Sequence, residues 1–234
     1  MIASILQPLD PSSAPDALHA PDGFLTLPVA LVMWALTIAV LAVAVQRTNR
    51  SLDERTVPLL GVMAAFIFAA QMFNFQVVGG TSGHLLGGVL VAVLLGPWAG
   101  TLVMACVVAV QALLFQDGGL VVLGANIFNM GVVGTLGGFV LYRVVVGLLG
   151  GERRGRIPAA AIAAYVAVVT GAVVMALQLA VSGFIALEVT LPVMVGVHAL
   201  IGIGEALITA AAISFIAVTR ADLFDLRDAG TAPA

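Results

Sequence analysis

The residues of this chain whose chemistry best suits a metal ion are its three histidines, His19, His84 and His198. Neutral imidazole is the commonest protein ligand for metal ions. A single histidine is more often a hydrogen-bonded structural group, but histidine inside a bilayer is costly and usually marks function. The interpretation therefore depends on whether the chain brings these side chains together.

The first histidine lies in a short hook that precedes a long apolar run. Residues 18 to 23 read Leu-His-Ala-Pro-Asp-Gly. Pro21 and Gly23 on either side of Asp22 predict a tight turn, because proline presets φ and glycine tolerates positive φ. Such a turn folds the segment back over the helix that follows, so His19 can carry a metal ligand into a helix bundle.

The second histidine ends a polar, glycine-rich stretch between two apolar runs, Asn74 to His84. Irregular backbone at membrane depth is tolerated only where protein or a water-filled cavity covers it. The glycines allow the imidazole of His84 to approach another segment, and Thr81 and Ser82 can orient it through hydrogen bonds. An ordinary flexible loop is the alternative interpretation of this stretch.

The composition indicates the environment of the elements that must position these histidines. Of the 234 residues, 62% are hydrophobic and 9% are charged. A soluble domain is typically about 25% charged, so we expect an integral membrane protein. The net charge of −3 and the lack of a basic patch argue against nucleic acid as a partner.

Seven apolar segments approach the length of about 20 residues that a transmembrane helix needs. We expect an all-α polytopic bundle with spans at 27–46, 58–75, 84–96, 97–116, 124–148, 158–186 and 191–219. Gly96-Pro97 predicts a break between the third and fourth spans, because proline disrupts a helix interior. The third span covers only about 20 Å at 1.5 Å per residue, so we expect it to cross incompletely, shielded by its neighbours.

The nine arginines set the predicted orientation. They lie in the loop at 47–57, between 143 and 156, and in the tail after 219. With seven spans and the N-terminus outside, all nine fall on the cytoplasmic side, as the positive-inside rule requires. Merging the third and fourth spans would move the arginines at 143–156 outside. We therefore expect an outside N-terminus and a cytoplasmic C-terminus.

This topology brings all three histidines to the outer face. The helices were counted without using the positions of the histidines. Asn126, near the outer end of the fifth span, either closes a pocket there or bonds across helices as structural glue, and the second interpretation is preferred. Glu205 lies on the same face of the last span as His198. A lone carboxylate near the bilayer middle is expensive, so we expect Glu205 to be protonated, paired, or engaged in a subunit contact.

Four separated motifs resemble the cobalt/nickel substrate-specificity subunits of energy-coupling-factor (ECF) transporters, the CbiM/NikM family. Members of that family open with Met-His-Ile-Pro-Asp-Gly, which corresponds to Leu18 to Gly23, and continue to Asn-Phe…Gly-Gly-Thr-Ser-Gly-His, which corresponds to Asn74 to His84. Gly124 to Gly131 and His198 to Glu205 look like further family signatures. The resemblance covers about residues 18–219.

The resemblance implies a non-catalytic, seven-helix membrane subunit that captures Ni²⁺ or Co²⁺ as its transported substrate. It also implies a transmembrane coupling subunit, cytoplasmic ATP-binding subunits and a small additional membrane subunit as partners, in the inner (plasma) membrane of a prokaryote.

The metal ligands that the resemblance implies are the amine of Leu18, the backbone and ring nitrogens of His19, and the imidazole of His84, with His198 lining or supporting the site. Four nitrogens in a plane suit Ni²⁺ or Cu²⁺ rather than Zn²⁺. Because the ligands must lose protons, we expect binding to decline as pH falls toward about 6.5, the ordinary pKa of histidine.

One feature departs from the family pattern. Seventeen residues precede Leu18, so its nitrogen would be an amide instead of an amine. A start at a leucine codon at position 18, or cleavage after Ala17, would restore the amine. We therefore expect a disordered N-terminal extension (1–17) that the mature protein lacks, a membrane metal-binding unit (18–219) and a cytoplasmic tail (220–234).

Two other functions stay open on sequence alone. A standalone secondary metal-ion transporter would usually carry inverted repeats and more intramembrane carboxylates than Glu205. A bis-histidine membrane haem protein would use His84 and His198 as axial ligands. The chain has no lysine, so it is not itself a P-loop ATPase, and uptake must draw its energy from a partner or an ion gradient.

Overall fold

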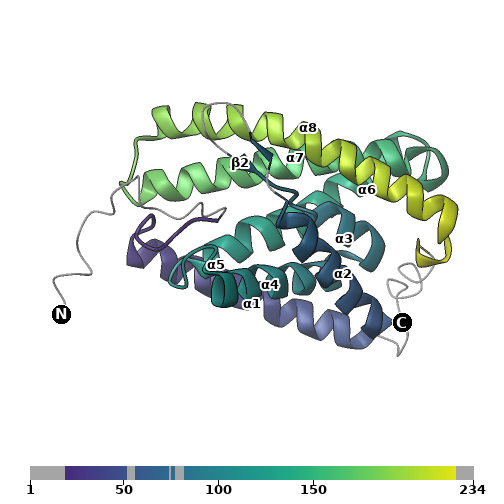
Figure 1. Cartoon of the computed structure of the whole chain (residues 1–234), viewed down its shortest axis with the longest axis horizontal. Coiled ribbons are helices and arrows are strands. Elements are labelled where there is room, and N and C mark those ends of the chain that lie inside the picture. Colours follow the sequence, from purple (N-terminus) through teal and green to yellow (C-terminus); the bar gives the residue numbers. More distant parts are fainter. Residues whose placement is uncertain (1–18, 52–55, 74, 77–81, 225–234) are drawn as a thin grey trace.

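The computed structural model (Figure 1) describes residues 19–51, 56–73, 75–76 and 82–224. Its elements in chain order are α1 (Leu27–Ser51), α2 (Thr56–Gln71), β1 (Phe75–Gln76), β2 (Ser82–Gly83), α3 (Gly88–Leu95), α4 (Pro97–Phe115), α5 (Leu123–Ile127), η3 (Phe128–Gly137), α6 (Gly138–Leu148), α7 (Glu152–Val181) and α8 (Leu187–Thr219). The two short strands pair antiparallel. The prediction of an all-α helix bundle is confirmed.

Five helical runs among the described residues are long and apolar enough to cross a bilayer: Leu27–Arg50, Pro97–Phe115, Leu123–Leu148, Glu152–Val181 and Leu187–Thr219. A shorter apolar helix, Val57–Gln71, accompanies them. Large apolar side chains such as Leu31, Val62 and Leu207 are exposed on the outside of the bundle. Helices that are apolar both inside and outside are typical of a membrane environment. The chain is a multi-pass membrane protein.

The third and fourth predicted spans are separate helices, as the Gly96-Pro97 pair indicated. α3 ends at Leu95 and α4 begins at Pro97, with Gly96 between them. The predicted span at 84–96 is too long, because residues 84–87 are not helical and α3 has only eight residues. It is about 12 Å long at 1.5 Å per residue, against a hydrocarbon core of about 30 Å. Its residues from Gly88 to Leu94 are buried by neighbouring helices.

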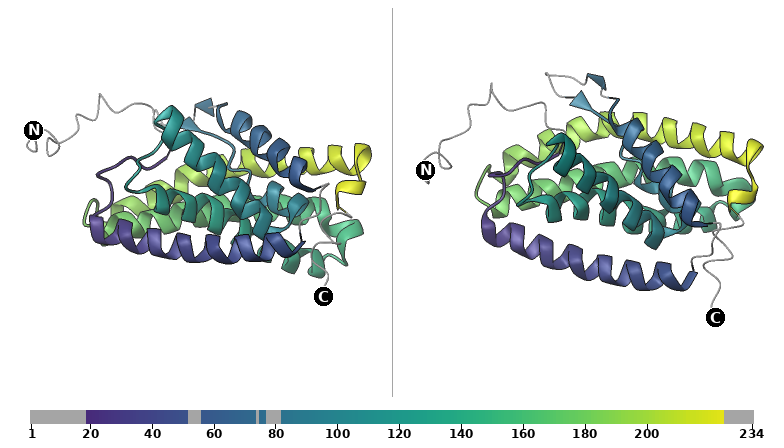
Figure 2. Two further views of the ribbon diagram at one scale, coloured as in Figure 1. Left: turned by 90° about the horizontal axis from the view of Figure 1, so that it is seen from below. Right: turned by 60° about the horizontal axis from the view of Figure 1, so that its bottom comes forward.

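α7 and α8 run side by side along one side of the bundle, and α1 lies on the side away from α8 (Figures 1 and 2). Both long helices begin earlier than predicted, at Glu152 and Leu187, so Pro158 and Pro192 lie inside them. Each proline stands within about the first two turns, where it removes only one early hydrogen bond of a long helix. The predicted helix starts at 158 and 191 are therefore wrong by several residues.

The fifth predicted span is one helical run made of α5, η3 and α6. Its middle part, η3, is a ten-residue π-helix that packs against α3, α4 and α7. The Thr135 hydroxyl donates to the Gly131 carbonyl within η3 and lies 2.5 Å from the Thr101 hydroxyl of α4. π-helical turns are rare in proteins, and those that occur are frequently found at functional sites. The apolar pattern of the sequence did not predict this one.

The two ends of the bundle differ in charge. The C-terminal ends of α1 and α8 lie together with the α6–α7 turn at one end (Figure 1). The described arginines belong to these segments: Arg47, Arg50, Arg143, Arg153, Arg154, Arg156 and Arg220. We call this the arginine end. The α7–α8 turn and the segment before α1 lie at the opposite end, which we call the hook end.

Candidate metal centre

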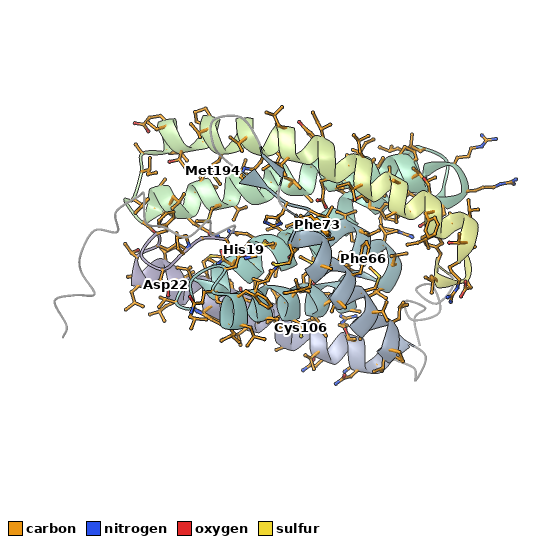
Figure 3. All side chains as sticks on the ribbon, in the orientation of Figure 1. His19, Asp22, Phe66, Phe73, Cys106 and Met194 are labelled. Atoms are coloured by element: carbon orange, nitrogen blue, oxygen red, sulfur yellow. The ribbon has the colours of Figure 1, made fainter. Side chains whose placement is uncertain are left out.

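The described part of the hook, residues 19–23, folds back into the bundle through the predicted turn. The backbone N–H of Phe24 donates to the Pro21 carbonyl (3.5 Å), and Gly23 has a φ of 94°. The chain then enters α1 at Leu27. Figure 3 shows His19 inside the bundle and Asp22 nearer to the hook end. Only 6% of His19 is exposed.

The carboxylate of Asp22 fixes the hook to the loop between α4 and α5. It accepts the backbone N–H groups of Leu120 (3.1 Å), Val121 (2.9 Å) and Val122 (3.2 Å). Gly119 permits this approach, because a Cβ at that position would lie 2.1 Å from Asp22 Oδ1. The turn that presents His19 is thereby joined to a segment about 100 residues further along the chain.

His19 is held by the same loop. Its backbone N–H donates to Asp117 Oδ1 (3.2 Å), and its ring Nδ1 lies 3.3 Å from the Asp117 carbonyl oxygen. A carbonyl oxygen only accepts, so the ring proton is on Nδ1 in this contact. The neighbouring carbonyl of Ala20 accepts from the Gly119 N–H (2.9 Å) and from Asn126 Nδ2 (3.0 Å). Asn126 therefore holds the backbone of the hook.

His84 lies in the non-helical segment 84–87, directly before α3. Its Nδ1–H donates to the Leu85 carbonyl (2.8 Å), so the lone pair is on Nε2. Glu205 of α8 clamps the same segment, because its Oε2 accepts the Leu86 N–H (2.6 Å) and its Oε1 accepts the Gly87 N–H (2.8 Å). Gly87 has a φ of 78° and packs against Ile67.

The contacts of Glu205 decide between its predicted roles. Its carboxylate is paired with two backbone N–H groups of the same chain, which is one of the roles that we expected. Only 2% of the residue is exposed. A residue buried to this extent does not present its side chain to another subunit, so the prediction of a subunit contact is wrong.

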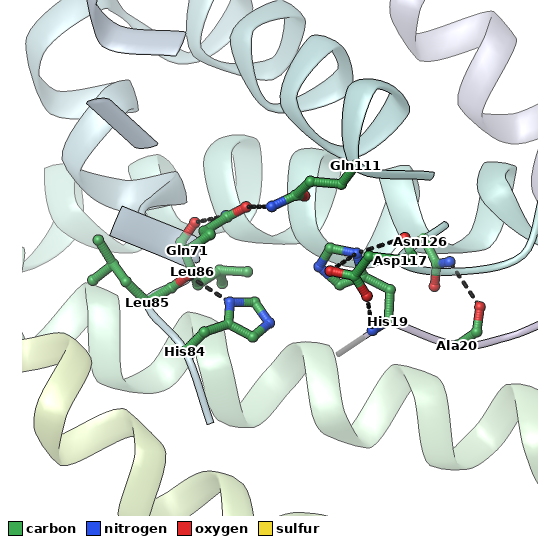
Figure 4. A network of polar contacts seen from close by, with 9 residues as sticks. All are labelled: His19, Ala20, Gln71, His84, Leu85, Leu86, Gln111, Asp117 and Asn126. Carbon is green, nitrogen blue, oxygen red and sulfur yellow. Dashed lines mark hydrogen bonds and ion pairs between the residues drawn. The ribbon is translucent and has the colours of Figure 1, made fainter. Parts of the chain in front are cut away.

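The structure brings His19 and His84 together. Their ring centroids are 5.3 Å apart and their planes meet at 79° (Figure 4). Nε2 of His19 is buried and has no hydrogen-bond partner among the described residues. Burial lowers the pKa of His84 to about 4, with the nearby His19 adding to the effect. Burial also lowers the pKa of His19, against the opposing influence of Asp117. Both imidazoles are therefore neutral at pH 7 and keep a lone pair.

A buried chain of hydrogen bonds joins the segments that carry the two histidines (Figure 4). Gln71 donates to the Leu86 carbonyl (2.8 Å), and Gln111 donates to Gln71 Oε1 (2.9 Å). The backbone carbonyl of Gln111 in turn accepts the backbone N–H of Asp117 (3.1 Å). The side-chain oxygen of Gln111 has no hydrogen-bond partner among the described residues, so the network is not fully satisfied, but its three bonds link the segment of His84 to the loop that holds His19.

The other predicted site residues lie around this pair. His198 of α8 donates from Nδ1 to the Met194 carbonyl (2.8 Å), and it is close enough to contribute to the lowered pKa of His84. Leu18 and Thr81 lie outside the described residues, as does the side chain of Ser82 in β2. Within the described part of the chain, no three side chains of His, Cys, Asp or Glu are arranged to hold a metal ion. A metal site here needs additional donors, such as backbone nitrogen.

Comparison with known families decides what this arrangement belongs to. Residues 19–223 match the CbiM family, described as the cobalt uptake substrate-specific transmembrane region. The chain belongs to this family. It is a substrate-specific membrane component of cobalt/nickel uptake, without catalytic activity of its own. Family membership favours metal-ion uptake over the haem interpretation.

Individual relatives of the CbiM family agree with this assignment. A protein of Archaeoglobus fulgidus assigned as a fused nickel transport protein, NikMN, is 41% identical over 215 residues, which cover 91% of this chain and 70% of that protein. A protein of Haloquadratum walsbyi assigned as a metal transport protein is 42% identical over 208 residues, which cover 88% of this chain and 93% of the relative. A crystal structure of a truncated transition metal transporter matches with a TM-score of 0.77 at 33% identity, covering 85% of this chain and 97% of the other.

Sequence reasoning missed the groups that hold the two histidines. Asp117 was not among the predicted site residues, although Asp117-Gly118-Gly119 is a turn pattern that, like Asp22-Gly23, pairs an acidic residue with glycine. Gln71 and Gln111 are fully buried polar residues in apolar helices. Polar residues in such helices are expensive and often functional, so their presence was a usable signal.

Proposed function

We propose that this CbiM-family chain captures Ni²⁺ or Co²⁺ at the hook end of the bundle. The ion is bound by the amine of residue 18, the backbone nitrogen and ring Nδ1 of His19, and Nε2 of His84. Partner proteins then drive its import. The observation that carries the proposal is the meeting of the His19 and His84 imidazoles, whose centroids are 5.3 Å apart, from two separate segments.

The arrangement of the nitrogen atoms supports this ligand set. The backbone nitrogen and Nδ1 of His19 both face Asp117, so the two atoms of the proposed chelate lie on the same side of the residue. The ion would replace the backbone proton of His19, because metal binding to nitrogen ligands releases protons. The ring proton would move from Nδ1 to the unpartnered Nε2, so that Nδ1 presents its lone pair to the ion. His84 offers Nε2 because its Nδ1–H is engaged by the Leu85 carbonyl.

The donor chemistry supports a late first-row metal. The described residues offer no cluster of three acidic, thiol or imidazole side chains at which a carboxylate or thiolate site could form. Two imidazoles supplemented by an amine and a backbone nitrogen form a four-nitrogen plane, which suits Ni²⁺. The relatives named as nickel and cobalt transport proteins are consistent with either ion as substrate.

A free amine at residue 18 requires that the functional chain begins there. We propose that residues 1–17 are absent from the mature protein, either because translation starts at position 18 or because the chain is cleaved after Ala17. The intact mass of protein purified from its native membrane tests this: a mass that includes residues 1–17, together with normal metal uptake, would contradict it.

The proposed topology has seven spans, with α2 and the short α3 counted, the hook end outside and the arginine end in the cytoplasm. All described arginines lie toward the arginine end, which supports this orientation through the positive-inside rule. Residues 18–219 then form the membrane unit and 220–234 a cytoplasmic tail. We propose an ECF coupling subunit, cytoplasmic ATP-binding subunits and a small additional membrane subunit as partners.

Metal titration of defined variants tests the site. Ni²⁺ and Co²⁺ binding would be measured by calorimetry on detergent-purified chains that begin at residue 18 or at residue 1. We expect tight binding only for the shorter chain, and its loss in both His19→Ala and His84→Ala. His198→Ala serves as a nearby matched variant and should weaken binding less. Tight binding that survives in both His19→Ala and His84→Ala would refute the site.

A further inference from the structure

One peptide bond connects Glu205 to the imidazole of His84. The carbonyl of the Leu85–Leu86 peptide accepts the proton of His84 Nδ1 (2.8 Å), and the N–H of the same peptide donates to Glu205 Oε2 (2.6 Å). We propose that Glu205 tunes His84 as a metal ligand through this peptide, as a carboxylate–peptide–histidine relay. The proposal rests on His84 being a ligand of the transported ion, as proposed above.

The chemistry follows from the polarity of the amide group. A carboxylate that accepts the N–H draws the proton toward itself and moves electron density onto the carbonyl oxygen, because linked hydrogen bonds polarise one another. A more negative carbonyl oxygen holds the Nδ1 proton of His84 more strongly, and the ring then becomes a stronger donor at Nε2. Metal-binding histidines commonly give their second N–H to a carboxylate, which fixes the tautomer and raises ligand basicity. In this chain the peptide stands between the two groups.

The geometry around Glu205 supports tuning in addition to simple anchoring. The shorter of its two hydrogen bonds goes to Leu86, which belongs to the peptide that His84 contacts, and the other goes to Gly87 (2.8 Å). Only 2% of Glu205 is exposed, so water does not weaken the influence of its carboxylate. Gln71 donates to the next carbonyl, that of Leu86 (2.8 Å), and holds the segment from the other side. The relay therefore has one fixed geometry.

Glu205 does not contact the proposed ion, so it is a positioning residue whose influence reaches the metal only through His84. The deciding variant is Glu205→Gln in the chain that begins at residue 18. Glutamine keeps the size of the side chain, removes the charge and replaces one acceptor oxygen by an NH₂ group. Glu188→Gln, an exposed carboxylate in the first turn of the same helix, is the matched control.

Two readouts would be recorded for each protein, the Ni²⁺ dissociation constant by calorimetry and the visible ligand-field band of bound Ni²⁺. Removal of a carboxylate behind a metal-binding histidine typically weakens binding about 10- to 100-fold. We expect a loss of this size in Glu205→Gln together with a band at longer wavelength, because a weaker imidazole donor reduces the ligand-field splitting. Glu188→Gln should match the unaltered chain in both readouts.

The relay would be overturned if Glu205→Gln bound Ni²⁺ with unchanged affinity, or if it bound Ni²⁺ more weakly while the visible band stayed at its original wavelength. If Glu205 only anchored the segment of His84, its loss would change how often the site forms but not the ligand field of the bound ion. His84→Ala separates the two proposals: if it binds Ni²⁺ normally, the metal site itself fails, and if only Glu205→Gln is silent, the relay alone fails. Should Glu205→Gln not yield a monodisperse protein, replacing the N–H of residue 86 by an ester oxygen cuts the relay with Glu205 in place. That chain is then expected to give the weaker binding and the shifted band.

Discussion

Replacing Asp22 is expected to weaken metal binding without removing any proposed ligand. The carboxylate docks the hook through three backbone N–H groups, at 2.9 to 3.2 Å. Because Asp22 is exposed, each bond contributes about 1 kcal/mol, below the range for buried charged groups. Asp22→Ala therefore removes about 3 kcal/mol of docking energy. Asp22→Asn keeps one acceptor oxygen and loses about 1 kcal/mol by the same measure.

These energies convert into affinities because only the docked hook places His19 beside His84. The apparent dissociation constant rises as the competent fraction falls, and 1.4 kcal/mol corresponds to a factor of about ten. We expect Ni²⁺ to bind up to about 100-fold more weakly in Asp22→Ala and about fivefold more weakly in Asp22→Asn. Calorimetry gives the affinities, and hydrogen exchange should show lost protection at the amides of residues 120–122. Asp222→Ala, an exposed carboxylate at the arginine end, is the control.

The same docking can be perturbed from the loop side. A Cβ on Gly119 would lie 2.1 Å from Asp22 Oδ1, so Gly119→Ala should displace the carboxylate and reproduce the loss seen in Asp22→Ala. Gly147→Ala, where an added Cβ meets nothing within 4 Å, is the matched control. If Asp22→Ala exposes the amides of 120–122 to exchange while Ni²⁺ affinity stays at its original value, the coupling between hook docking and metal capture is refuted.

Two further expectations concern pH and the membrane core. Burial lowers the pKa of His84 to about 4 and also lowers the pKa of His19, so protons should compete with the metal for these imidazoles at a lower pH than for an ordinary histidine. The Ni²⁺ dissociation constant measured from pH 8 to 5 should rise steadily as pH falls, because the backbone nitrogen of His19 and the amine of residue 18, whose ordinary pKa is about 7.7–8.0, both give up protons to bind the ion. An additional steepening near 6.5 would contradict the lowered pKa values of the imidazoles. Asn129 and Gln178 exchange two side-chain hydrogen bonds (3.0 and 2.9 Å), so Asn129→Leu or Gln178→Leu alone should cost about 1 kcal/mol of unfolding free energy. The double variant should recover part of that loss in thermal unfolding in detergent, and simple additivity would show that the pair is not coupled.

The sequence predicted the parts of the fold that depend on local chemistry. The Pro21–Gly23 turn and the break at Gly96-Pro97 follow from the backbone preferences of proline and glycine, and both are present. Hydropathy identified the apolar helices, and the arginine pattern separated the two ends. The meeting of His19 and His84 followed from these steps, because the loops that carry them were assigned to the same end.

The parts that were missed depend on contacts between distant segments. The bond from His19 to Asp117 joins residues 98 apart, and that from Leu86 to Glu205 joins residues 119 apart. Apolar periodicity indicates that a helix exists but not which polar group it presents to a partner. The eight-residue length of α3 and the π-helical η3 have the same origin, since packing against neighbouring helices decides them.

The position of Glu205 along α8 has a mechanical consequence. From Glu205 to Thr219 the helix contains neither glycine nor proline, so this stretch of about 21 Å is a stiff rod that ends at the arginine end. Twisting or sliding the tip of α8 at the arginine end would pull the Leu86 and Gly87 amides, and with them His84, away from the hook. A protein that bound this tip of α8 would therefore act on the proposed metal site through the helix itself.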